Sequence, residues 1–300
     1  MSLVNKFKSI QNNGSVDDIL KEIGADFKAE KVAISWGKSP DELKDADRYC
    51  GIANGDKLLA IMKSEYGVVQ YSDAVEFLND LIVKGSTNVD YGAVTDNGAR
   101  LHLMCTTDYV AQLAAGDSVK CYFTVSSSHD GTGSLLISCT PIHTASETVF
   151  TPMGAGVIKM RHSKHVKDRM AQTARAMHKI SDYFLNFTET IDRLKGLTVT
   201  KDQETIFVTM LEDGDSQRAE NIRTRVLDIF HFGAVSKIPS CQGTLFGLLI
   251  SAQYYCDNYK VVRKSGIRNE IDAFIESKLT GDAARMKAQA FAIALQLEKM

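Results

Sequence analysis

A regular apolar spacing in the second half of the chain constrains the fold more than any other feature. Nine residues recur in alternating steps of four and three: Val166, Met170, Thr173, Met177, Ile180, Phe184, Phe187, Ile191 and Leu194. Only Thr173 is polar, and this spacing places the side chains along one stripe of an α-helix. Ser163 can cap the helix start, and Gly196 follows its end. We predict one long helix over residues 163–196, with its stripe buried against another helix of this chain or of a second subunit.

The first half of the chain carries strand and turn signals instead. Asp96-Asn97-Gly98 separates two alternating segments, and Asn and Gly adopt turn conformations at little cost. This predicts a hairpin. Leu101 and Leu103 alternate with His102 in its second strand, so we expect the His102 side chain to point away from the core.

A second hairpin is predicted between Cys121 and Cys139. Asp-Gly is a preferred turn dipeptide, and glycines supply conformations closed to other residues. We interpret the connecting residues as a structural turn without a catalytic or metal-binding role: His129, Asp130, Gly131 and Gly133.

Helical signals dominate the remainder of the chain. Thr200 and Gln203 have the spacing of a capping box, and Gly233 terminates a segment with Ile222 and Val226 on its inner face. The segment GTLFGLLISAQYYC is apolar on all sides and should be buried. We therefore predict an α+β fold, with a hairpin-rich region over residues 1–156 and a helical region over 157–300, forming one compact unit.

Composition limits the function classes. Lys and Arg number 35 against 37 Asp and Glu, so a polyanion site must be a local patch. The six cysteines lie in apolar runs without a CxxC pair, which predicts buried, reduced thiols. The sequence has no apolar run long enough to span a bilayer, and its first residues lack the apolar segment of a signal peptide, so we expect none. We expect a cytoplasmic protein that does not enter membranes.

Motifs for common chemistries are missing. The sequence has no GxGxxG or GxxxxGK[ST] phosphate loop, no HExxH pair and no GxSxG elbow. His162 and His165 have a metal-ligand spacing, but Arg161 and Lys164 beside them oppose a divalent cation. We expect no cofactor, no metal and no enzymatic activity, and the open alternative is an enzyme whose site is assembled from scattered Cys and His residues.

The segment from Lys159 to Lys179 is strongly basic. Several of its cations fall opposite the apolar stripe of the predicted helix, which is the pattern of a ridge that tracks phosphates. The alternative is a solvated helix face balanced by acids elsewhere. The candidate nucleic-acid-binding residues are Lys159, Arg161, Lys164, Lys167, Arg169, Arg175 and Lys179.

A second basic run follows three tyrosines, Tyr254, Tyr255 and Tyr259. Aromatic rings beside cations suit unpaired bases. The secondary candidates are Lys260, Arg263, Lys264 and Arg268.

Several motifs occur together in one order. They are YGVVQYSDAVEFLNDL, YGAVTDNGARLHLM, SSSHDGTGSLLISCTPIH, IKMRHSKHVKDRM and QGTLFGLLISAQYYCDNYKVVR. From about Tyr66 to the C-terminus the chain thus resembles the phage/plasmid-like family of domain of unknown function 932. The most specific element is His129-Asp130-Gly131-x-Gly133 with Pro141 after the next strand.

The chain departs from this family in one place. The family usually has an arginine, a cysteine and an asparagine after that proline, where this chain has His143, Ser146 and Thr148. If the family's cysteine were a nucleophile or ligand, this chain would have lost it. The resemblance implies a phage or plasmid setting, and with it the cytoplasm of a bacterial host cell. It also implies a role in replication, recombination or counter-defence. Hairpins followed by a basic helix are also similar to single-strand annealing proteins, at the level of the fold.

The sequence therefore leads to one hypothesis and one alternative. The hypothesis is a non-enzymatic, DNA-associated phage or plasmid protein, oligomeric with copies of itself, that prefers single-stranded DNA. The alternative is a protein-binding factor, such as an inhibitor of a host defence complex, that uses the long helix as its interface.

Overall fold

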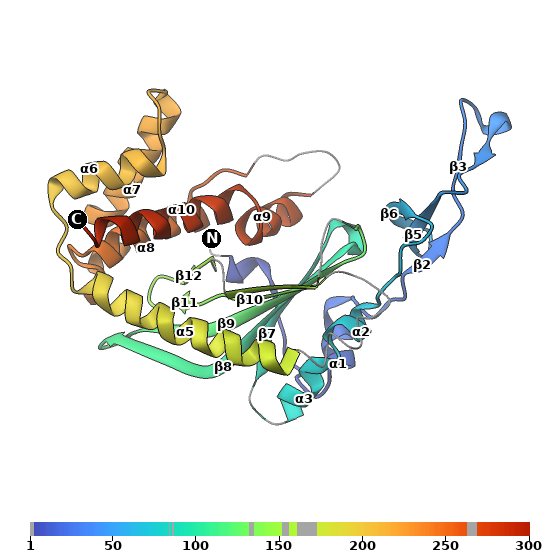
Figure 1. Ribbon diagram of the computed structural model, residues 1–300, viewed down its shortest axis with the longest axis horizontal. Coiled ribbons are helices and arrows are strands. Elements are labelled where there is room, and N and C mark those ends of the chain that lie inside the picture. The colour runs from blue at the N-terminus through green and yellow to red at the C-terminus, as the bar shows by residue number, and fades with distance from the viewer. Residues whose placement is uncertain are drawn as a thin grey trace.

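The computed structural model describes residues 3–83, 85, 87–131, 135–151, 156–160, 173–262 and 269–300. Strands are concentrated before Met160 and helices after Thr173, so the fold is α+β, as predicted (Figure 1).

An antiparallel sheet forms the centre of the molecule. Within the described residues it has eight strands, in the order β1-β7-β8-β9-β10-β13, with β11 pairing with β9 and β12. Their bounds are β1 Lys8–Ser9, β7 Asn88–Thr95, β8 Arg100–Ala114, β9 Asp117–Ser128, β10 Leu135–Cys139, β11 Ile142–His143, β12 Thr148–Val149 and β13 Val157–Met160. The predicted turn at 96–98 is confirmed as η3 (Asp96–Gly98) between β7 and β8. Since β13 pairs with β10, the sheet continues four residues beyond the predicted regional boundary.

A smaller strand region extends away from this sheet, drawn in blue in Figure 1. Its strands are β2 Glu30–Val32, β3 Ser35–Trp36, β4 Lys44–Asp45, β5 Tyr49–Asn54 and β6 Lys57–Lys63, with η2 Pro40–Glu42 between β3 and β4. Near the main sheet lie η1 Val4–Lys6, α1 Val16–Ile23, α2 Tyr71–Val75 and α3 Phe77–Val83. One face of the β2-β5-β6 sheet covers a small core around Ile52.

The long helix is confirmed where the structure describes it. α5 runs from Thr173 to Lys195, directly before Gly196, whereas residues 163–172 lie outside the described residues. It is followed by α6 Lys201–Leu211, α7 Gln217–Phe232, η5 Val235–Lys237, η6 Pro239–Cys241, α8 Leu245–Asn258, α9 Glu270–Leu279 and α10 Asp282–Leu297. The predicted capping box of Thr200 and Gln203 starts α6.

The stripe of α5 lies inside this chain. Ile180, Phe184, Phe187, Ile191 and Leu194 are buried in one core together with inner residues of the sheet and of α8. The sequence left open whether the stripe packs within its own chain or against a second subunit. The structure shows it packed within its own chain. The six cysteines are all buried, as predicted.

The prediction for His102 is wrong, because the main sheet is covered on both faces. Its side chain is only 3% exposed. The second face of β8 and β9 carries Met104 and Tyr122, which pack with Ile275 of α9. A strand covered on both sides has no solvent-facing set of side chains. The alternation of apolar residues with His102 therefore does not show that His102 is exposed.

None of the described helices combines the length and apolarity needed to cross a membrane.

Candidate nucleic-acid interface

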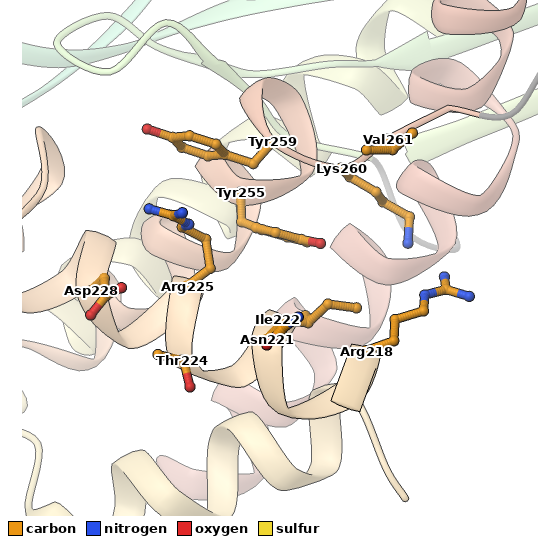
Figure 2. Close-up of a pocket in the computed structure, with 10 residues that line it drawn as sticks. All are labelled: Arg218, Asn221, Ile222, Thr224, Arg225, Asp228, Tyr255, Tyr259, Lys260 and Val261. Atoms are coloured by element: carbon orange, nitrogen blue, oxygen red, sulfur yellow. The ribbon is translucent and has the colours of Figure 1, made fainter. Parts of the chain in front are cut away.

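A cavity of about 670 Å³ lies between α7 and the end of α8 (Figure 2). It is open to solvent, and its volume lies within the usual range of ligand sites. We call it the α7–α8 groove. Its lining residues are Arg218, Asn221, Ile222, Thr224, Arg225, Asp228, Tyr255, Tyr259, Lys260 and Val261.

The helix α7 supplies one wall. Ser216 caps its start by accepting the Ala219 N–H, and Ile222 anchors it in the core. Residues at helical spacings of three, four and seven share a face. Arg218 and Arg225 therefore stand on the face of α7 that carries Ile222, at the edge of the core.

The end of α8 supplies the other wall. The N–H groups of Tyr259 and Lys260 both donate to the Tyr255 carbonyl, at 2.9 and 3.0 Å. These bonds close the last turn of the helix and keep Lys260 beside Tyr255. Figure 2 shows the Arg218 and Lys260 side chains at one end of the groove, Arg225 and Tyr259 at the other, and Tyr255 between them.

The groove is positively charged. Its lining contains three cations, Arg218, Arg225 and Lys260, and one acid, Asp228. Within the part of the chain that the structure describes, none of these three cations forms an ion pair. Arg218 and Arg225 are both exposed. The groove can therefore attract an anion from solution.

The two tyrosines of the groove differ in exposure. Tyr255 is 9% exposed, and burial raises the pKa of its phenol. Tyr259 is 48% exposed, and the guanidinium of Arg225 lies 5.2 Å from its ring centroid. This distance is that of a cation–π contact. An aromatic ring with an exposed surface thus stands directly beside the cations.

A second cavity of about 410 Å³ adjoins the groove, since both are lined by Arg218, Lys260 and Val261. Arg100 also lines it, but this guanidinium already pairs with three carboxylates, those of Asp96, Asp130 and Glu276. Although burial alone would lower the pKa of Arg100, these carboxylates raise it. Because its charge is matched inside the protein, Arg100 is a poor candidate for holding an external anion.

The connection between β9 and β10 belongs to this internal network. The Arg100 Nε donates to Asp130 Oδ2 at 2.7 Å. His129 is fully buried, with its ring 4.1 Å from that of Tyr71. Gly131 has a φ of +68°, and a Cβ there would lie 2.2 Å from Met62. His129 and Asp130 thus tie the β9–β10 connection to its neighbours, while Gly133 lies outside the described residues.

The structure describes only part of the predicted cationic segment. Lys159 is exposed on β13, at the edge of the sheet, rather than on the helix. Arg175 and Lys179 lie on α5, and Lys179 is exposed. Arg161, Lys164, Lys167 and Arg169 lie outside the described residues.

The secondary candidates have one described member, Lys260, and it lines the groove. Arg263, Lys264 and Arg268 lie outside the described residues. Sequence reasoning missed Arg218 and Arg225. Their spacing of seven along α7 was a usable signal, but Glu220 and Asp228 between and beside them give this segment a mixed charge.

The residues at the family departure form a buried hydrogen-bonded set. His143 Nδ1 lies 2.7 Å from Ser146 Oγ, and His143 Nε2 lies 2.6 Å from Asp117 Oδ1. Although burial alone would raise the pKa of the Asp117 carboxyl, hydrogen bonds from His143 and Ser240 lower it. These residue types also form hydrolase triads. Here His143 and Asp117 are 0% and 1% exposed, and neither cavity described above includes them, so their evident role is to join β9 to β11.

The fold and the groove define an α+β protein with a cationic, tyrosine-lined surface site. A family model described as a domain of unknown function (DUF932) matches residues 58–274. The chain therefore belongs to this family, as its motifs indicated. No curated protein and no solved structure matches the chain.

Proposed function

We propose that this is a DNA-associated protein that holds the phosphates of single-stranded DNA in the α7–α8 groove. The observation that carries the proposal is the set of three cations, Arg218, Arg225 and Lys260, that pair with no acid among the described residues and lie beside two tyrosines. With the family resemblance, this supports a non-enzymatic role in the replication or recombination of a phage or plasmid.

The physical basis is counterion release. Each phosphate that a cation neutralises releases condensed counterions, so affinity falls as salt concentration rises. For single strands each contact adds about 0.7 to the log–log slope, so three groove cations should contribute about 2. The formal net charge of −2 requires such a local patch, since the whole molecule does not attract polyanions.

The alternative of a protein-binding factor receives less support. That alternative uses the long helix as its interface. From Ile180 to Leu194, the stripe residues are buried in the core of this chain, which leaves only the other faces of α5 for a protein partner.

The test is binding of a fluorescently labelled single-stranded 30-mer, followed by anisotropy across a salt series. The variant combines Arg218→Gln, Arg225→Gln and Lys260→Gln. The matched control removes the same charge from exposed lysines of the small strand region, with Lys38→Gln, Lys44→Gln and Lys57→Gln.

We expect the groove variant to bind more weakly and to lose about 2 from the salt slope, while the control keeps the parent's slope. Equal slopes for parent and groove variant would remove the groove from the binding site. No binding by the parent at low salt would reject DNA as the partner and favour a protein partner.

A further inference from the structure

We propose that Tyr259 stacks on an unpaired base, and that this contact makes the groove select single strands over duplex. This inference rests on the proposed function, since it assumes that phosphates enter the groove. It adds the chemical group that is recognised and the residue that recognises it.

The position of the ring supports stacking. Tyr259 follows the last residue of α8, lines the groove, and remains 48% exposed. Tyr254 lies beside it, with ring centroids 6.2 Å apart and planes inclined by 53°. This inclined neighbour supports an edge of the ring without covering the ring as a stacked neighbour would.

Arg225 fixes the ring and adds charge. Its guanidinium lies 5.2 Å from the Tyr259 centroid. A cation over one face of an aromatic ring holds it in place and leaves the opposite face for another π system. A base stacked on Tyr259 would therefore meet a pre-positioned ring, which lowers the entropic cost of binding.

Phosphates have a separate place in the same groove. The charged ends of Arg218 and Lys260 lie away from Tyr259, with Tyr255 between (Figure 2). A nucleotide can thus place its base on Tyr259 and a neighbouring phosphate near Arg218 and Lys260. The cavity of about 670 Å³ has room for a unit of this size.

Stacking distinguishes single strands from duplex. In a duplex, both faces of each base are already covered by neighbouring bases, so Tyr259 would have to displace one. A single strand offers exposed base faces, and stacking on an aromatic ring tolerates any base.

The experiment compares three labelled ligands of the same length with the whole protein. They are a single-stranded 20-mer of thymidine, the corresponding strand in which every base is replaced by an abasic site, and the thymidine strand paired with its complement. The abasic strand keeps the phosphates and removes the stacking partner.

Three variants separate the role of the ring. Tyr259→Ala removes it, and Tyr259→Phe keeps the stacking surface without the hydroxyl. Tyr109→Ala is the matched control, since Tyr109 is 49% exposed on β8 and lines neither cavity.

We expect the parent to bind the thymidine strand about 5- to 150-fold more tightly than the abasic strand. Tyr259→Ala should reduce thymidine-strand affinity towards the abasic value and leave abasic binding unchanged. Tyr259→Phe and Tyr109→Ala should behave as the parent.

Equal parent affinities for the thymidine and abasic strands would overturn the stacking inference. The proposed function would survive that result if both ligands kept a salt slope that depends on Arg218, Arg225 and Lys260. Thymidine-strand binding unchanged by Tyr259→Ala would also overturn the inference. Failure of the parent to bind any of the three ligands would reject both proposals.

Discussion

Two charged regions meet at the end of α8, one a buried ion pair and the other a groove open to solvent. Asp257 is buried and pairs with Lys287 of α10, Oδ1 to Nζ, at 2.5 Å, and both side chains are 0% exposed. Three residues later, Lys260 enters the groove, where the described part of the chain offers no acid within ion-pair distance. In the first region the chain itself supplies the ion-pair partner of Asp257. In the second region the cations are available to solvent or to a ligand.

Because of this difference, substitutions in the two regions should affect different properties of the protein, its stability or its affinity for a ligand. Removing one member of a buried pair leaves the other charge without compensation in a poorly solvated place. Removing a groove cation, which pairs with no acid in the described part of the chain, leaves no buried charge without compensation. We therefore expect changes in the buried region to alter the free energy of unfolding and changes in the groove to alter affinity.

The largest effect should follow Asp257→Ala. The change leaves Lys287 buried without its carboxylate and removes an acceptor for the Val149 N–H. We expect a loss of about 3–5 kcal/mol in the free energy of unfolding, measured with urea. Combining Asp257→Leu with Lys287→Met should recover part of it, because both members of the pair are then absent while Lys278 stays buried beside them. A loss below about 1 kcal/mol for the single variant would show that the pair is not buried.

An apolar change of similar size provides a comparison without charge. Phe187 of α5 is 5% exposed, and its ring centroid lies 4.8 Å from Phe150 and 5.8 Å from Phe291. Phe187→Ala should cost about 3–5 kcal/mol of unfolding free energy. Leu185→Ala is the control, since Leu185 on the same helix is 54% exposed. Similar losses for both variants would contradict the burial of the stripe.

The local features of this fold could be predicted from the sequence. The end of α5 at Lys195, the capping box at Thr200 and the turn at Asp96–Gly98 each depend on residues within one or two turns of chain. Their physical causes, caps and turn conformations, are therefore readable locally.

The features that depend on distant contacts could not be predicted. His102 is buried because α9, more than 160 residues later, covers its face of the sheet, and Glu276 lies 3.0 Å from its Nε2. The groove exists because α7 and the end of α8 meet in space. Of its cations, sequence reasoning found only Lys260, since it lies in a basic run.

Lys278, in the buried region, should make the stability of the fold depend on pH. It is 2% exposed and donates to the Cys256 carbonyl. Burial lowers the pKa of its amine to about 8. In the unfolded chain the pKa is about 10.4, so between these values the unfolded state binds more protons. This group should therefore stabilise the fold progressively as pH rises from about 8 to about 10.4, by up to about 3 kcal/mol.

The measurement is urea unfolding at several pH values for the parent and for Lys278→Met. Comparison is needed because Cys256 acts in the opposite direction. Burial raises the pKa of this thiol to about 12, so the unfolded state loses its proton first and stability falls with rising pH. The difference between parent and variant isolates Lys278. A difference that does not change with pH would show that this amine keeps its ordinary pKa.

Substitutions in the α7–α8 groove should hardly change the free energy of unfolding, in contrast to those in the buried region. Arg218→Gln and Lys260→Gln should each change the free energy of unfolding by less than about 0.5 kcal/mol, because no ion pair is lost in the described part of the chain. Arg225→Gln also loses the cation–π contact with Tyr259 and should cost up to about 1 kcal/mol. Urea unfolding of the single variants tests this. A loss above about 1.5 kcal/mol in any of them would show that the cation has a structural role.

The last prediction tests whether a second region, outside the groove, also binds DNA. Lys164→Gln with Lys167→Gln removes two cations of the predicted basic segment, which lie outside the described residues. If both contact phosphates, the log–log salt slope for single-stranded DNA should fall by about 1.4, and affinity should weaken similarly for unrelated sequences, because phosphates carry no sequence code. Neither residue belongs to the apolar stripe, so folding should be preserved. An unchanged slope would leave the groove as the site to which binding is assigned. A slope reduced in this variant, and reduced further when the three groove cations are also neutralised, would show that one strand contacts both regions.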